Sequence, residues 1–232
     1  MWITTARYFK TALEPNYYKM KKLLILSLGL FCATNSFSQS KKKAKSEIEY
    51  VSLGPTIGIG HSWLSNLDHQ SIKPSGHLGI SFIYSRFEHW GWGADLVASH
   101  EGFRVELPND VMASVDPTYI RLTPKAYYFF GDYGDKCRPK LFAGPSLAYK
   151  VQEDHYYDGD RIGDNRTFPW DTKNVFDDID MGIMIGGGLN MRLAKSLWLN
   201  LDGSYYHGLV DVTDNDQRNR NLRFNVGLMF GL

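Results

Sequence analysis

The chain has 232 residues, with 26 Lys and Arg against 25 Asp and Glu and a mean hydropathy of −0.32. This composition excludes a bundle of transmembrane helices, because no run of about 20 apolar residues occurs. The near balance of charge gives no reason to expect a nucleic-acid partner. A membrane β-barrel remains open, since half of the residues in each barrel strand are polar, and the 14 Tyr, 6 Trp and 22 Gly favour it.

The N-terminal 47 residues have the pattern of a segment that targets the chain for secretion, and we expect them to lie outside the folded domain. Met20 to Lys22, followed by the apolar stretch LLILSLGLFCA, has the basic start and short hydrophobic core of a secretory signal peptide. Ser36 and Ser38 are the small residues expected before a cut at Gln39. The expected segments are an over-extended start (1–19), a cleaved signal peptide (20–38) and a basic periplasmic leader (39–47).

From residue 48 onward, apolar and polar residues alternate in eight segments. In the clearest segment, Ile120 and Leu122 alternate with Arg121 and Thr123. Successive side chains on a strand point to opposite faces, so each segment has one apolar face and one polar, small or charged face. Several reach ten residues or more, whereas the strands of soluble sandwiches are usually about five or six. In chain order the segments cover residues 51–63, 78–85, 94–101, 119–130, 141–151, 181–192, 197–204 and 222–230.

The connections between these segments alternate between long and short. The four long ones are expected at residues 65–76, 107–117, 152–179 and 211–220. Transmembrane barrels have an even number of strands, short periplasmic turns and longer extracellular loops. We therefore expect an all-β, eight-stranded antiparallel up-and-down transmembrane β-barrel over residues 48–232, with both termini periplasmic. A soluble β-sandwich is the competing interpretation.

Five stretches of the barrel segment carry a family resemblance. They are YIRLTPKAYYFFG (119–131), KLFAGPSLAYK (140–150), GIMIGGGLNM (182–191), SYYHGLVDV (204–212) and RFNVGLMFGL (223–232). With them the chain resembles the PorT-like outer-membrane β-barrel family of Gram-negative bacteria with type IX secretion, over essentially residues 48–232. The resemblance implies a barrel in the outer membrane and no particular reaction. Because the namesake acts in type IX secretion, it also implies a role as an accessory of envelope or secretion machinery.

Seven charged side chains are expected to point into the barrel. They are Asp95, Glu101, Arg121, Lys125, Arg192, Asp202 and Arg223. The interior of an eight-stranded barrel is just wide enough for side chains to fill it, and a buried charge without a partner is costly. We therefore expect paired charges that fill the interior. A narrow pore or a carrier of small ligands is the alternative.

Two further sets of residues have the chemistry of a site. The acidic loop offers oxygen ligands for Ca²⁺ or Mg²⁺ without the regular order of an EF-hand, so a solvated loop is the favoured interpretation. The loop residues concerned are Asp154, Asp158, Asp160 and Asp164. Ser204, His207 and Asp211 include the residue types of a hydrolytic triad, but Ser204 and His207 lie three apart on one strand and so face opposite ways.

The sequence thus predicts a non-enzymatic outer-membrane barrel without a metal or cofactor. We expect a monomer surrounded by outer-membrane lipid, with envelope or secretion-complex proteins as its partners and no nucleic acid. A narrow pore or a carrier of small ligands is the second hypothesis, and an outer-membrane enzyme is the third.

Overall fold

The computed structural model describes residues 50–67, 70–71, 73–107, 111–132, 135–157, 160–161, 175–213 and 216–232. The expected start, signal peptide and leader, residues 1–47, lie outside the described residues. A search of the described part of the chain found no helix long and apolar enough to span a membrane.

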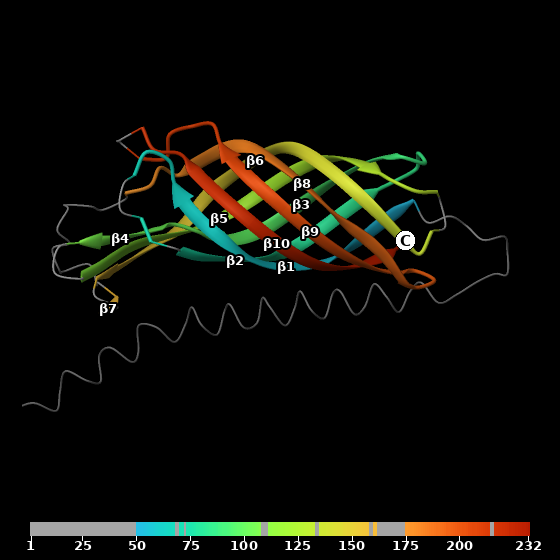
Figure 1. Cartoon of the computed structure of the whole chain (residues 1–232), viewed down its shortest axis with the longest axis horizontal. Coiled ribbons are helices and arrows are strands. Elements are labelled where there is room, and N and C mark those ends of the chain that lie inside the picture. Colours follow the sequence, from blue (N-terminus) through green and yellow to red (C-terminus); the bar gives the residue numbers. More distant parts are fainter. Residues whose placement is uncertain are drawn as a thin grey trace, which may run out of the picture. The chain divides into compact units, whose positions relative to one another are not determined.

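The described part of the chain contains ten strands, each antiparallel to the strands with which it pairs. They are β1 (Val51–Leu64), β2 (Lys73–Tyr84), β3 (Trp90–His100), β4 (Phe103–Leu107), β5 (Val111–Phe129), β6 (Cys137–Tyr157), β7 (Asp160–Arg161), β8 (Ile179–Ala194), β9 (Leu197–Gly208) and β10 (Asn219–Gly231). Eight of them pair in the order β1-β2-β3-β5-β6-β8-β9-β10, and β10 pairs with β1, so the ring closes (Figure 1). The predicted eight-stranded antiparallel barrel is confirmed.

The outward faces of the strands form an apolar band. Ile59 is 72% exposed and Leu78 is 60% exposed. The band consists of Ile57, Ile59, Leu78, Ile80, Phe82, Leu96, Ile120, Leu122, Leu141, Leu147, Ile183, Ile185, Leu222, Phe224, Val226 and Leu228. A continuous apolar surface of this extent is unfavourable in water and suits contact with lipid, so the structure excludes the soluble sandwich.

The two ends of the barrel differ. We call the end with the β2–β3, β5–β6 and β8–β9 connections the turn end. Both ends of the described chain meet there, because the Leu232 N–H donates a hydrogen bond to the Val51 carbonyl at 2.9 Å. The opposite end, which we call the loop end, carries β4 and β7 (Figure 1).

All four segments predicted to be loops are in part strand. β2 begins at Lys73 and β10 at Asn219, and the segments 107–117 and 152–179 contain longer stretches of strand. β5 begins at Val111 and β6 runs on to Tyr157, and the two pair with each other beyond the apolar band. β4 adds to the free side of β5, and β7 to that of β6. Proline cannot donate a hydrogen bond to a ladder. Pro117 lies next to a register shift between Thr118 and Tyr119, where an irregular ladder accommodates proline.

Candidate functional site: the charged interior and the loop-end pocket

The inward side chains come from alternate positions on each strand. On β5 these are Arg121, Thr123 and Lys125, all of which are buried. The intervening Ile120 and Leu122 lie in the apolar band. Alternation on the pleated strand therefore places the cations of β5 inside the barrel.

The interior groups nearer the loop end form a network around Arg121. Its guanidinium lies 3.0 Å from Oε2 of Glu101 and 2.8 Å from Oδ2 of Asp180. Nη2 of Arg223 lies 2.5 Å from Oε1 of the same Glu101. The hydroxyl of Tyr206 donates a hydrogen bond of 2.7 Å to Oδ1 of Asp180. Two guanidinium groups and two carboxylates thus neutralise one another with almost no exposure to solvent.

A second set of ion pairs lies nearer the turn end. Lys125 pairs with Asp95 across the β3–β5 ladder. Nζ of Lys140 lies 2.9 Å from Oδ1 of Asp202. The Lys125 ammonium also lies 4.5 Å from the centroid of the Phe142 ring, a contact that stabilises a cation away from water.

Apolar clusters lie on either side of these charges. The cluster that extends to the turn end contains Ile83, Tyr127, Phe129, Phe142, Met184, Tyr206 and Met229. The cluster at the loop end contains Leu64, Phe103, Val105, Ala113, Val115, Phe176 and Val212. In the residues that the structure describes, buried side chains therefore lie along the interior from the turn-end cluster to the loop-end cluster, as expected for a barrel of this width.

The structure brings six of the seven predicted interior charges into these networks. Arg192 lies elsewhere: it is exposed near the turn end of β8, with its guanidinium 5.7 Å from the centroid of the Trp198 ring. Its position in the alternation is inward, but it lies next to a register shift at the end of the strand, beyond the filled interior.

Sequence reasoning missed two central members, Asp180 and Lys140. Asp180 stood between the expected loop 152–179 and the segment that begins at residue 181, and Lys140 stood just before the segment 141–151. On β8, Asp180 alternates in step with the inward Gly182. On β6, Lys140 alternates in step with the inward Ser146. Longer expected strands would therefore have identified both residues.

The predicted cation loop is only partly described. Asp158 and Asp164 lie outside the described residues, and so does the side chain of Asp160. Asp154, on β6, accepts a hydrogen bond of 2.8 Å from the Gln152 amide. Over the described ranges, no group of three or more His, Cys, Asp or Glu is placed to hold a metal ion. The cation site stays a prediction.

The three residues weighed as a hydrolytic triad point in different directions. Ser204 is buried in the interior, whereas His207 is exposed on the outer face of β9. Asp211 accepts a hydrogen bond of 2.8 Å from Nε of Arg218. Since a triad needs its three groups in mutual contact, these residues do not form one in this arrangement.

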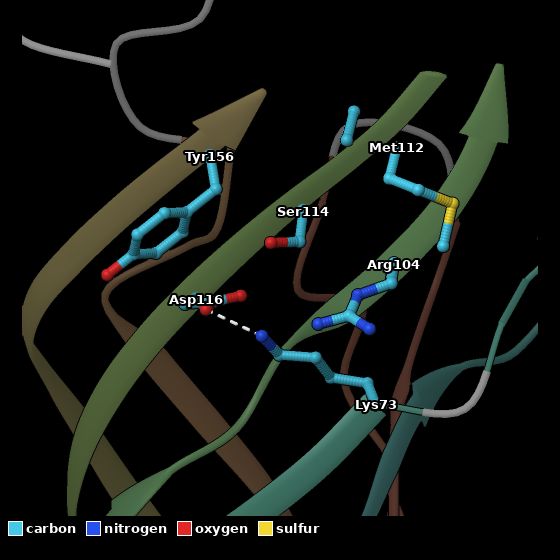
Figure 2. A pocket seen from close by; sticks show the side chains of 7 residues that line it. Lys73, Arg104, Met112, Ser114, Asp116 and Tyr156 are labelled. Atoms are coloured by element: carbon cyan, nitrogen blue, oxygen red, sulfur yellow. Dashed lines mark hydrogen bonds and ion pairs between the residues drawn. The ribbon is translucent and has the colours of Figure 1, made fainter. Parts of the chain in front are cut away.

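A pocket of about 390 Å³ opens at the loop end, between β2, β4 and the extensions of β5 and β6. Its lining residues are Lys73, Arg104, Met112, Ala113, Ser114, Asp116 and Tyr156 (Figure 2). Nζ of Lys73 lies 2.6 Å from Oδ2 of Asp116, and both side chains are buried. Sequence reasoning missed this pocket because most of its residues were assigned to the loops 65–76 and 107–117.

The family model for the outer membrane protein beta-barrel domain matches residues 37–214. The chain belongs to this family. Membership points to the outer membrane, in agreement with the apolar band. The narrower PorT-like assignment goes beyond what this match shows.

Two outer-membrane barrels of known structure resemble this family member. Neisserial surface protein A is 13% identical, with a TM-score of 0.51, over 82% of this chain and 100% of its own. OprG from Pseudomonas aeruginosa is 13% identical, with a TM-score of 0.55, over 78% of this chain and 94% of its own. Identities this low show a shared fold and nothing more. No significant sequence match was found among curated proteins.

Asp116 makes the stability of the loop end depend on pH. It lies beyond the apolar band, which on β5 begins at Ile120. Burial raises the pKa of the Asp116 carboxyl, but His100 and Lys73 outweigh burial and hold the pKa below its usual value. A depressed folded-state pKa adds stability above the unfolded value of about 3.9, and that stability is lost as the pH falls through the folded pKa.

We therefore expect the amide protons of β4 and the β5 extension to lose protection once the pH falls below about 4. Their exchange rates should then rise relative to the intrinsic rates of unprotected amides at the same pH. The measurement is hydrogen exchange on the refolded barrel, corrected for the intrinsic effect of pH. Asp116→Asn is the control, because it removes the titrating group and should flatten this dependence. An equally steep dependence in Asp116→Asn would assign the effect to other groups.

Proposed function

We propose that this member of the family is a closed, non-enzymatic outer-membrane barrel that presents its loop end to other envelope components. The observation that supports a closed barrel is the pairing of eight interior charges between two apolar clusters. A water-filled channel needs polar groups that face water, whereas these groups face one another. In such a barrel, function depends on the surfaces that contact other molecules and not on transport through the interior.

In this proposal the turn end and both termini are periplasmic, and the loop end is outside the cell. The support is general: outer-membrane barrels have short periplasmic turns and longer extracellular loops. The chain is synthesised with a cleaved signal peptide, residues 20–38. Within the family it is a PorT-like barrel and serves as a monomeric accessory of envelope or secretion machinery.

The orientation predicts which sites are accessible on intact cells. An epitope tag at Asp216, exposed at the loop end, should be labelled by antibody without lysis. A tag at Asp135, exposed in the β5–β6 turn, should be labelled only after the outer membrane is opened. The reverse pattern would invert the proposed orientation, and a heat-dependent shift on gels verifies that each tagged barrel is folded.

The accessory role predicts stable partners. Crosslinking in intact outer membranes, followed by purification of the barrel, should recover the same envelope proteins in repeated preparations. A barrel of similar size and abundance from the same membranes is the control for random neighbours. Recovery of only those neighbours that the control also recovers would contradict the accessory role.

A further inference from the structure

The loop-end pocket has polar groups that neither the interior networks nor the proposed accessory role uses. The side chains of Arg104 on β4 and of Ser114 and Asp116 on β5 line this pocket. The neighbouring Phe103 and Val115 belong to the loop-end apolar cluster. Its volume of about 390 Å³ lies within the range of about 300–1,000 Å³ that is usual for sites of small molecules. The pocket lies beyond the apolar band, so its occupant comes from water and not from the lipid core.

Most of the charge in the pocket is already neutralised. The Asp116 carboxylate lies 2.6 Å from the Lys73 ammonium and 3.7 Å from Nε2 of His100. Glu106, the acidic residue of β4, accepts a hydrogen bond of 2.8 Å from the Ser71 hydroxyl. The negative groups near the pocket are thus engaged by other partners.

Arg104 differs from these groups. Its side chain is half-buried and points into the space between Lys73 and Ser114 (Figure 2). Among the described residues, its guanidinium has neither a hydrogen-bond acceptor nor an ion-pair partner. A guanidinium presents a planar fork of donors that matches carboxylate and phosphate oxygens in pairs. The pocket therefore holds one cation whose preferred partner is an oxyanion.

The other lining residues supply further hydrogen-bond donors and an apolar wall. Ser114 and Tyr156 also line the pocket, and their hydroxyls have no hydrogen-bond partner in the part of the chain that the structure describes. Each hydroxyl is a donor that a ligand in the pocket can use. Met112 and Ala113 supply an apolar wall, and small-molecule sites commonly combine such a wall with a few converging polar groups.

We propose that this pocket binds a small oxyanion, a carboxylate or a phosphate carried on a short apolar group, with Arg104 as the main binding residue. Ser114 and Tyr156 add hydrogen bonds, and the Lys73–Asp116 pair forms the rigid floor. This site is independent of whether the barrel interior conducts, because it opens beyond the apolar band.

The test is titration of the refolded full chain in a zwitterionic detergent, followed by amide shifts of β4 and β5 in NMR spectra. The probes are butyrate, inorganic phosphate and butanol, which separate the carboxylate, the phosphate and the apolar chain. Butyrate or phosphate should bind, and butanol should not. Arg104→Gln should weaken binding by about tenfold or more, the factor that accompanies loss of a charge-assisted hydrogen bond.

Arg86→Gln is the matched control, because Arg86 is exposed at the turn end and should leave the affinity unchanged. Ser114→Ala should cause a smaller loss than Arg104→Gln. Tighter binding of butyrate identifies a carboxylate ligand, and tighter binding of phosphate identifies a phosphate ligand; either supports the site. Equal affinity of the parent and a folded Arg104→Gln variant, equal binding of butanol and butyrate, or no binding of any probe would overturn it.

Discussion

Arg121→Ala should destabilise the barrel by roughly 3–5 kcal/mol, the usual cost of breaking a buried ion pair from one side. Arg121 is fully buried, and its removal leaves Asp180 without its cation and Glu101 with Arg223 alone. It also removes the guanidinium that lies 4.1 Å from the centroid of the Tyr206 ring. The measurement is reversible unfolding in urea from lipid vesicles, with the heat-dependent gel shift as a second readout.

Two variants make this result specific. Arg86→Ala, at an exposed site of the turn end, should change stability by no more than about 0.5 kcal/mol. Arg121→Met combined with Asp180→Asn should recover part of the loss, because removing both charges is less costly than leaving one of them buried. A loss below about 1 kcal/mol for Arg121→Ala would show that water reaches these carboxylates.

The parent protein in planar bilayers should show no steady single-channel conductance. The interior charges pair with one another, and the apolar cluster that extends to the turn end contains Tyr127, Phe129 and Phe142. A continuous column of water would have to separate these groups, which the width of an eight-stranded barrel does not allow. A porin reconstituted under identical conditions supplies the reference conductance.

Large and stable currents from the parent barrel would contradict the closed interior and favour the pore hypothesis. In that case, neutralising Lys125 and Lys140 should alter ion selectivity, since both ammonium groups would line the path. In a closed barrel the same substitutions lower the stability of the protein and produce no current across the bilayer. The two interpretations therefore differ in both measurements.

The amino-acid sequence by itself determined the strand faces and the closure into eight strands. The alternation of Ile120 and Leu122 with Arg121 and Thr123 is local, because each side chain points opposite to its neighbour whatever the strand pairs with. Lys125 and Asp95 were likewise expected on neighbouring strands, and β3 and β5 do pair. Local alternation failed where strands ran past the apolar band, as at Asp116 and Pro117.

Only the tertiary structure decided which charges meet across the barrel. Arg121 contacts Asp180 although β6 separates β5 from β8, and Arg223 of β10 contacts Glu101 next to the end of β3. These contacts follow from closure and register, which bring distant strands around one narrow interior. The loop-end pocket has the same origin: Lys73 and Asp116 are 43 positions apart in the chain and meet only because β2 and the β5 extension converge at one rim of the barrel.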